Sequence, residues 1–396
     1  MVRVKATIRA SILLSILALL LIPIGKVDAH AYSASYTTLT LTKANIGMTY
    51  TLDELSVIEL TDGDVNKNSM LEPEEFDAVK DRILELLKKD IQLEIDNVPQ
   101  EWSQIESFTL KREGDATKVI LNITFPPVLA SQSISLTDNL YLIDKNTANY
   151  VDLVKINYGT QNSTSALSGK YRVWSMQLTE SDYAALRQDL QSQPNSNSTE
   201  SGGTESSDGL GHISGWFSFF TLGMGHILGG YDHLLFLFSL LIARQTFKQY
   251  AKMITAFTIA HSITLTLTVL GIINIPAWFV EPAIALSICY VAVENIVRKD
   301  VSYRWVLTFL FGLIHGMGFA DILKEMDIPR SELATDLISF NLGIETIQVA
   351  LVALLLLPLI MLHRWKFLRR AVIVGSAIAL ILGAYWLIDR IIIMSA

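Results

Sequence analysis

Hydrophobic and polar positions divide the chain into two parts of different character. Between residues 30 and 213 the sequence is polar, with short alternating stretches typical of strands that bury one face. From residue 214 to 396 the apolar positions form long runs, typical of helices that cross a bilayer. We therefore predict a multi-domain protein, in which a β-rich domain precedes a polytopic α-helical membrane bundle.

The first 29 residues have the layout of a secretory signal peptide. Basic residues between positions 3 and 9 precede the apolar run 12–24, and the small residue Ala29 ends the segment. Cleavage after Ala29 is predicted, and an uncleaved N-terminal anchor is the alternative. In both cases the β-rich domain, residues 30–190, is exported.

Alternating stretches predict the strands of this domain, and one charged amphipathic stretch predicts a helical insertion. The strands are expected at residues 36–41, 107–110, 118–124, 133–136 and 170–177. The helix is expected over residues 73–95. Such a set is compatible with a small sandwich, although the pattern does not fix the strand order. Residues 191–213, rich in Ser, Asn, Gly and Thr, are predicted to be a flexible linker.

An EF-hand-like calcium loop is predicted at residues 64–75. Its oxygen-bearing side chains have the ligand spacing of such a loop, which ends in a bidentate glutamate. The expected calcium ligands are Asp64, Asn66, Asn68, the Met70 carbonyl and Glu75. Ser69 replaces the usual glycine of the sharp turn, and the asparagines lower the loop charge, so a dissociation constant of about 10⁻⁴–10⁻³ M is expected. An acidic turn without calcium is the alternative.

Six apolar segments follow, each long enough to cross a hydrocarbon core of about 30 Å. They cover residues 216–243, 253–272, 279–297, 305–322, 337–361 and 371–393. With the β-rich domain outside, ten Lys and Arg residues lie on the cytoplasmic side and three on the outer side, which satisfies the positive-inside rule. We predict a multi-pass plasma-membrane protein, in contact with lipid, whose N-terminal domain and C-terminus are extracytoplasmic.

Charge, cysteine content and motifs exclude several function classes. Residues 30–213 hold 27 acidic and 14 basic side chains, which argues against nucleic acid as a partner and is compatible with attraction of cations. The single cysteine, Cys289, lies in an apolar run, so a disulfide framework is excluded. The sequence has no P-loop or other nucleotide-binding motif, so a gradient would drive any transport.

Ionisable residues inside the apolar segments mark the candidate site, because such groups are costly in hydrocarbon and are generally functional. Counted along helices that rise about 1.5 Å per residue, four of them fall near the bilayer midplane: His226, His261, His315 and Glu345. Asp232 and His233 follow in the first segment. Imidazole and carboxylate groups suit zinc, nickel, cobalt or copper better than magnesium or calcium. For any single histidine, an interhelical hydrogen bond is the alternative.

The spacing of two of these histidines predicts a broken helix. His226 and His233 are seven residues apart, and a straight helix would separate them by about 10 Å along its axis. Both can bind one ion only if the helix breaks between them, and Gly229-Gly230 is where a break is expected. In the fourth segment Gly312 and Gly316 flank the histidine, and we expect them to let another helix approach closely.

Further polar residues are assigned to a path through the bundle: Glu281, Glu294, Asn341 and Gln348. Glu281 is expected at the outer mouth and Glu294 in the cytoplasmic half. On the fifth segment Asn341 and Gln348 share a stripe with Glu345. Polar groups on both sides of the midplane favour a permeation path, whereas a hydrolytic pocket needs access from one side only.

These residues lie in a series of motifs that resembles the HupE/UreJ family of membrane proteins. The motifs are HILGGYDHLLF (226–236), FTIAHSITL (257–265), EPAIALS (281–287), EN (294–295), FGLIHGMGFA (311–320) and FNLGIE (340–345). The family is regarded as a group of secondary nickel or cobalt permeases, associated with hydrogenase and urease accessory genes. The resemblance implies such a permease, in which His226, Asp232 and His233 carry the leading signature. The long exported domain with its EF-hand-like loop departs from the small permeases.

Three functions are compatible with these observations, and a secondary permease for a divalent transition metal such as nickel or cobalt is preferred. In the second, an intramembrane zinc hydrolase, three histidines and an acid would hold the metal and Asp232 or Glu345 would act as general base. In the third, a membrane-anchored sensor or adhesion protein, the exported domain would be the working part. The third function leaves the intramembrane histidines unexplained, so a transporter is expected rather than an enzyme or a sensor.

Overall fold

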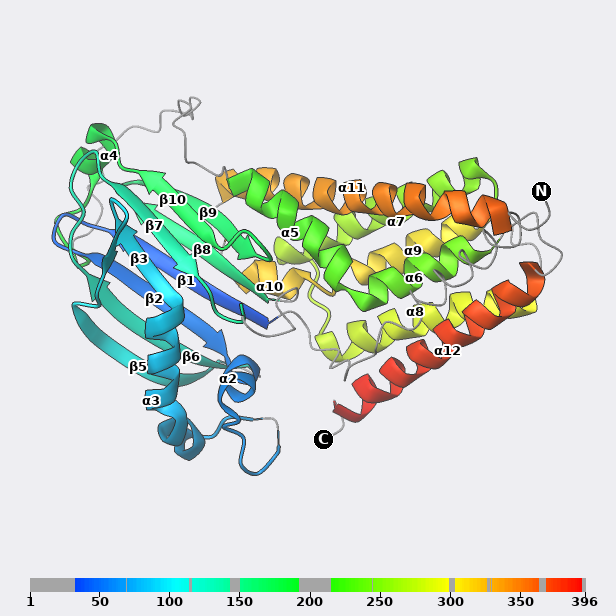
Figure 1. Ribbon diagram of the computed structural model, residues 1–396, viewed down its shortest axis with the longest axis horizontal. Helices are drawn as coiled ribbons and strands as arrows, with labels where there is room; N and C mark the ends of the chain where they lie inside the picture. The colour runs from blue at the N-terminus through cyan, green and yellow to red at the C-terminus, as the bar shows by residue number, and fades with distance from the viewer. Residues whose placement is uncertain are drawn as a thin grey trace, which may run out of the picture.

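Alternation of buried and exposed side chains builds two sheets in the N-terminal domain. The computed structural model describes residues 33–68, 70–113, 116–142, 150–191, 215–243, 245–298, 303–325, 328, 330–362 and 368–393. The predicted signal peptide and almost all of the predicted linker lie outside these residues. Figure 1 shows the β-rich domain at one end of a bundle of long helices, so the predicted division into two parts is confirmed.

The larger sheet has the strand order β5-β6-β2-β1-β8-β9, in which only β1 and β8 are parallel neighbours. Its strands are β1 (Ser33–Leu41), β2 (Ile46–Asp53), β5 (Gln104–Glu113), β6 (Ala116–Phe125), β8 (Tyr150–Tyr158) and β9 (Gln161–Ser168). The smaller sheet is antiparallel, in the order β10-β7-β3-β4. Its strands are β3 (Ile91–Ile95), β4 (Val98–Gln100), β7 (Ser133–Asp138) and β10 (Val173–Gln177).

Short helices connect the strands, and α3 (Pro73–Asp90) is the predicted helical insertion. It starts with proline at its first position and turns Phe76, Ile83 and Leu87 into the core between the sheets. The predicted end at residue 95 is wrong, because residues 91–95 leave the helix as strand β3. The other helices of the domain are α2 (Glu54–Thr61) and α4 (Glu180–Ala185).

A network of buried polar groups lies inside this domain. The Tyr150 hydroxyl donates to Asp138 at 2.5 Å and the Tyr50 hydroxyl at 3.2 Å, while the Thr37 hydroxyl donates to Asp152 at 2.9 Å. Burial raises the pKa of Asp138 to about 6 and that of Asp152 well above its ordinary value, because a buried carboxylate loses its hydration.

The N-terminal domain is expected to lose stability as the pH rises from about 4 to above 6. A raised folded-state pKa contributes stability that is complete below the unfolded pKa of about 3.9 and is lost as the pH passes the folded value. For Asp138 the change is on the order of 3 kcal/mol. Thermal unfolding followed by near-ultraviolet circular dichroism measures it. Asp138→Asn removes the titrating group and should flatten the slope near pH 6, so an unchanged slope in this variant would contradict the assignment.

The apolar half forms the helices of the bundle. Among the residues that the structure describes, four stretches are long and apolar enough to cross a membrane: Phe247–Val269 (α7), Ala277–Val297 (α8), Glu332–Leu355 within α11 (Arg330–Leu362) and Arg369–Ile392 within α12 (Leu368–Ile393). A fifth crossing results if α5 (Gly215–Gly229) and α6 (Tyr231–Ile242) count as one bent span. The predicted fourth segment forms the shorter α9 (Arg304–His315) and α10 (Ala320–Glu325), which accounts for the difference from six spans.

Contacts between helix ends define the two ends of the bundle. Thr164 of β9 donates to Glu332 near the start of α11, and Arg390 near the end of α12 pairs with Glu281 near the start of α8. These contacts lie at the end that carries the β-rich domain, here named the domain end; the opposite end is the far end (Figure 1). The last helix therefore returns to the side of the N-terminal domain, as the predicted topology requires.

Candidate metal site

A break at Gly230 brings two histidines of one apolar segment together. The axes of α5 and α6 differ by 68°. A Cβ atom on Gly230 would lie 2.8 Å from the His226 carbonyl oxygen and 2.8 Å from Nδ1 of His233, so only glycine fits at the bend. The ring centroids of His226 and His233 are 4.6 Å apart, against about 10 Å along a straight helix. The predicted break is confirmed.

Four buried histidines from four helices form a cluster around this bend, named here the histidine cluster: His226 (α5), His233 (α6), His261 (α7) and His315 (α9). The His233 ring has its centroid 4.6 Å from that of His226, 5.2 Å from that of His315 and 6.1 Å from that of His261. The three histidines placed at one depth by helix rise alone therefore meet in space.

Hydrogen bonds at Nδ1 orient two of these rings. Nδ1 of His233 lies 3.0 Å from the Asp232 carboxylate, and Nδ1 of His315 lies 2.8 Å from the Phe311 carbonyl oxygen. Because a carboxylate or carbonyl oxygen can only accept, each Nδ1 carries the proton and each Nε2 keeps its lone pair. Among the residues that the structure describes, Nε2 of His233 and His315 and both nitrogens of His261 have no hydrogen-bond partner.

This donor set fits a transition-metal ion. Buried polar atoms are nearly always paired, and converging imidazole lone pairs are ligands for zinc, nickel, cobalt or copper. Within the described ranges, no three His, Cys, Asp or Glu side chains already stand in coordinating positions. Binding at about 2.0–2.1 Å therefore requires the rings to rotate toward a common centre.

Glu345, predicted as the fourth midplane ligand, does not join the histidines. Its side chain is exposed on α11, whereas the preceding Ile344 is buried in the bundle. Successive helical residues point about 100° apart, so equal depth does not place two groups on the same face. Asp232 is the carboxylate that lies beside the histidine cluster.

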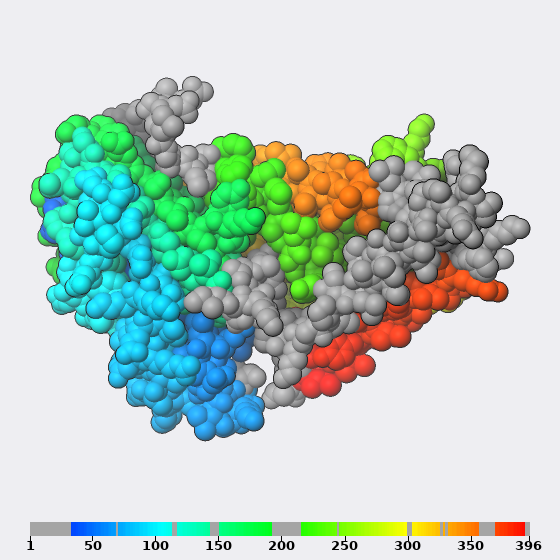
Figure 2. All heavy atoms as spheres, in the orientation of Figure 1, coloured from blue at the N-terminus to red at the C-terminus, as the bar shows by residue number. Residues whose placement is uncertain are grey.

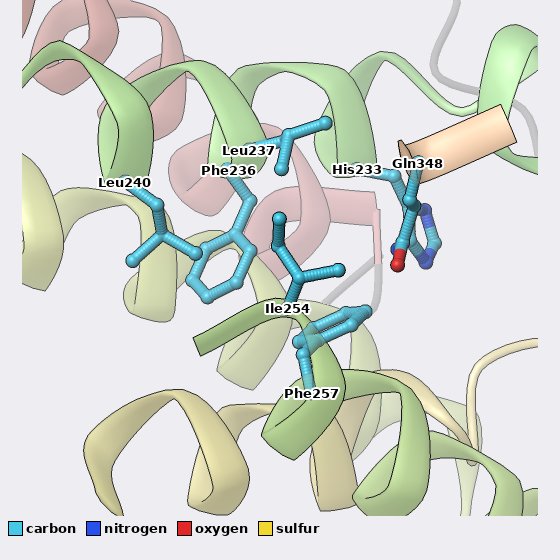
Figure 3. A pocket seen from close by; sticks show the side chains of 7 residues that line it. All are labelled: His233, Phe236, Leu237, Leu240, Ile254, Phe257 and Gln348. Carbon is cyan, nitrogen blue, oxygen red and sulfur yellow. The ribbon is translucent and has the colours of Figure 1, made fainter. Parts of the chain in front are cut away.

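A small cavity adjoins His233 (Figure 3), and its other lining residues on α6 lie nearer the far end. Its volume of about 20 Å³ has room for roughly one water molecule. Its lining is apolar except at the polar side chains of His233 and Gln348. The other lining residues are Phe236, Leu237, Leu240, Ile254 and Phe257. Gln348, predicted as a path residue, is buried and its Oε1 accepts from Thr258 at 3.0 Å.

The other predicted path residues contact partners at the helix ends or on their own helix. Glu281 pairs with Arg390 at 2.9 Å at the domain end. At the far end Glu294 accepts two hydrogen bonds from the buried Arg304, at 3.1 and 3.2 Å. Asn341 donates to the Leu337 carbonyl of its own helix at 2.8 Å. In this conformation the two carboxylates join helices to one another.

The aromatic residues around the histidines were not predicted from the sequence. Phe319 has its ring centroid 4.5 Å from that of His226 and stacks on Phe340 at 5.1 Å with an interplanar angle of 5°. Phe257 lies 5.2 Å from His315 and 5.9 Å from His261. Each of these aromatic residues lies inside a motif that also carries one of the predicted site residues, which was the available signal.

The glycines beside His315 let α9 approach α7, as predicted. A Cβ atom on Gly312 would lie 2.6 Å from the Phe257 carbonyl oxygen, and one on Gly316 would lie 2.3 Å from the His261 carbonyl oxygen. Both positions oppose backbone atoms, so the neighbouring helix itself would have to move.

Gly316→Ala is therefore expected to lower the free energy of unfolding by about 1–3 kcal/mol and to weaken metal binding, because overpacking moves His315 away from His261. Gly318→Ala is the matched control, since the nearest atom to its Cβ would be the flexible end of Ile284 at 3.0 Å and the nearest backbone atom would be 3.5 Å away, at ordinary contact distance. Thermal unfolding and metal titration of both purified variants test this prediction. Equal effects of the two substitutions would contradict it.

The predicted calcium loop lies between α2 and α3. Asp64 Oδ1 and Asn66 Oδ1 both accept from the Asn68 amide, at 3.1 and 3.0 Å. The Asn68 side chain accepts from the Met70 amide at 2.8 Å, and Glu75 accepts from the Asn66 amide at 3.4 Å. The side-chain oxygens of the predicted ligands thus turn into the loop, and calcium binding stays a prediction.

Calcium is expected to stabilise the N-terminal domain at millimolar concentration. At a concentration tenfold above the dissociation constant, the gain is about 1.4 kcal/mol. Glu75→Gln removes the bidentate carboxylate and should abolish the calcium-dependent rise in the unfolding midpoint. Glu74→Gln, exposed on the same helix, is the control and should keep it. A similar response of both variants would show that calcium does not bind in this loop.

The fold and the histidine cluster define the class: a polytopic helical membrane protein with a buried, multi-helix imidazole site. Residues 207–390 match the family model described as HupE / UreJ protein. This part of the chain, which contains every member of the histidine cluster, belongs to the HupE/UreJ family. No curated protein matches the sequence.

Proposed function

We propose that the protein is a secondary permease that carries a divalent transition-metal ion, with nickel or cobalt as its cargo. The observation that supports this most directly is the meeting of four buried imidazole rings at a helix break inside the membrane bundle. The HupE/UreJ family is generally associated with nickel and cobalt transport, and the imidazole donor set suits these ions.

The chain's own residues prepare the site for a cation. Asp232 and the Phe311 carbonyl hold the rings of His233 and His315 with Nε2 as the donor atom, which raises ligand basicity. The carboxyl end of α5 carries the negative end of a helix dipole and stops at the histidine cluster. Discontinuous helices of this kind bind coupling ions in many secondary transporters.

The cavity beside His233 supports an ion as the cargo. Its lining on α6 includes His233 and, nearer the far end, Leu240. With room for about one water molecule, the cavity suits a partly dehydrated ion better than a peptide or lipid substrate.

We also propose that the domain end faces outward at the plasma membrane. The signal-peptide layout and the excess of Lys and Arg on the opposite side support this orientation.

If the exported domain alone were the working part, as in a sensor or adhesion protein, deletion of residues 30–213 would abolish the phenotype and histidine substitutions would not.

Uptake of ⁶³Ni²⁺ and ⁵⁷Co²⁺ into proteoliposomes, together with bound-metal analysis, tests the permease. Saturable uptake is expected in the wild type and should be lost in the double variant His226→Ala/His315→Ala. Stoichiometric zinc without flux would overturn transport and favour a hydrolase. Neither bound metal nor flux would leave the histidines as packing groups.

A further inference from the structure

The N-terminal domain and the membrane bundle are joined by backbone as well as side-chain contacts. Strand β9 is the edge of the larger sheet, and its Ala166 amide donates to the Ser218 hydroxyl of α5 at 3.0 Å. A Cβ atom on Gly215 would lie 2.5 Å from the Thr164 carbonyl oxygen, so the start of α5 lies directly against β9 (Figure 1). Helix α5 thus covers a strand edge that would otherwise be open to pairing.

The sheet also contributes apolar side chains to the bundle. One cluster of buried residues contains members from both parts. From the sheet come Ala34, Val151, Leu153 and Ala166, and from the bundle Phe219, Leu222, Ile227, Leu265, Phe319, Ala320, Leu323, Ile328, Leu337, Phe340 and Ile344. Strand β8 therefore buries both faces, with Tyr150 and Val154 in the core of its own domain and Val151 and Leu153 against the helices. The space-filling view in Figure 2 shows the two parts in contact.

This shared cluster reaches the candidate metal site. Phe319 belongs to it and has its ring centroid 4.5 Å from that of His226. Leu323 of α10, in the same cluster, is fully buried. A continuous apolar layer thus lies between the sheet and the histidine cluster at the domain end. Such a layer opposes the passage of an ion, because a charge loses its hydration there.

A polar contact lies at the border of this layer. The Thr164 hydroxyl lies 2.6 Å from a Glu332 carboxylate oxygen and 2.8 Å from an Asp336 carboxylate oxygen. Both carboxylates are on α11, so one hydroxyl of β9 connects the sheet to a second helix. The sheet is thereby held to α5 through Ala166 and to α11 through Thr164.

We propose that the N-terminal domain is the gate at the domain end of the bundle. Its sheet holds the apolar layer of Phe319, Phe340 and Leu323 against His226, and it must move away before an ion can exchange on this side. The inference gains its meaning from the proposed transport, but the contacts that support it are independent of the cargo. The inference assigns a role to the exported domain, and this domain is the part of the chain that the small permeases lack.

Labelling of single cysteines in the full-length protein tests the gate. In a Cys289→Ser background, Leu323→Cys reports on the apolar layer. In a separate protein, Ala34→Cys, at a position buried against the helices, reports on the contact between the sheet and the bundle, here named the seam. Each is combined with Ala166→Glu or Gly215→Leu, which place a charge or a side chain in the seam. Thr109→Glu, exposed on the opposite edge strand β5, is the matched control. The probe is a membrane-impermeant maleimide added from the side of the N-terminal domain.

Both reporters should be protected with an intact seam and in the control, and both should react at least about tenfold faster in the two seam variants. Labelling at position 34 without labelling at 323 would overturn the gate, because the domain would leave without opening the layer. Protection of both cysteines in both seam variants would overturn it as well, because these contacts would then not make the seam. Labelling does not depend on transport. If the wild type showed no ⁶³Ni²⁺ uptake but the cysteines gave the expected labelling pattern, the proposed permease would be rejected and the proposed gate would be kept.

Discussion

His233→Ala is expected to lower the affinity for nickel or cobalt by about 100-fold or more and to abolish saturable uptake. His233 is the centre of the cluster, with ring contacts to His226, His261 and His315. Loss of a residue that only orients a ligand typically costs about 10–100-fold in metal affinity, so loss of a ligand should cost at least the upper value. Isothermal titration of the detergent-solubilised protein and uptake into proteoliposomes measure the two effects.

Two further variants grade this prediction. Asp232→Asn leaves the ligand in place but weakens its orientation, so an affinity loss of about 10–100-fold is expected. Leu228→Ala is the control. Leu228 lies on α5, two residues from His226, and its side chain is exposed, so this substitution should leave metal binding unchanged. If His233→Ala and Leu228→Ala bound metal equally well, His233 would be a packing residue.

The assembly of the site from separate helices was predictable as far as it depends on distance along a helix. The seven-residue spacing of His226 and His233, together with two glycines between them, required a break, and the chain bends there. Helix rise placed His261 and His315 at the same depth, and their rings meet in the histidine cluster. Depth alone does not determine direction around the axis, so Glu345 was assigned to the cluster although it faces outward.

Other features depend on partners far apart in the sequence. Strand β8 escaped prediction because residues 150–154 are buried on both faces, which removes the alternation of apolar and polar positions. That double burial results from the docking of the sheet on the bundle, and a strand pattern does not encode it. Likewise, the sequence predicts Glu294 to be a path residue, whereas in the fold its carboxylate pairs with Arg304.

At the far end a network of hydrogen bonds centred on Arg304 joins the helices. This buried guanidinium donates to Glu294 on α8 and to the Asn295 side chain, and it also reaches the Leu240 carbonyl of α6 at 3.5 Å. The cavity beside His233 is lined at one end by the same Leu240. If the protein carries an ion as proposed, the network lies at the end of α6 through which the ion would leave the bundle.

Arg304→Met is expected to lower the free energy of unfolding by about 3–5 kcal/mol, because it leaves the buried Glu294 carboxylate without its main partner. Arg298→Met is the matched control, since Arg298 approaches the same carboxylate at 3.6 Å with a 63% exposed side chain. An exposed pair contributes at most about 1 kcal/mol. Thermal unfolding in detergent compares the two variants. Similar losses would show that burial of Arg304 is not the cause.

The double variant Glu294→Gln/Arg304→Met separates stability from transport. Removing both charges avoids an unpaired buried charge, so most of the lost stability should return. If Glu294 serves only to fasten the helices, ⁶³Ni²⁺ uptake should be kept or should rise in the stable double variant, because the far end opens more easily. If its carboxylate also contacts the passing ion, uptake should fall although stability has recovered. The uptake rate of this variant therefore decides whether Glu294 belongs to the path or to the fastening.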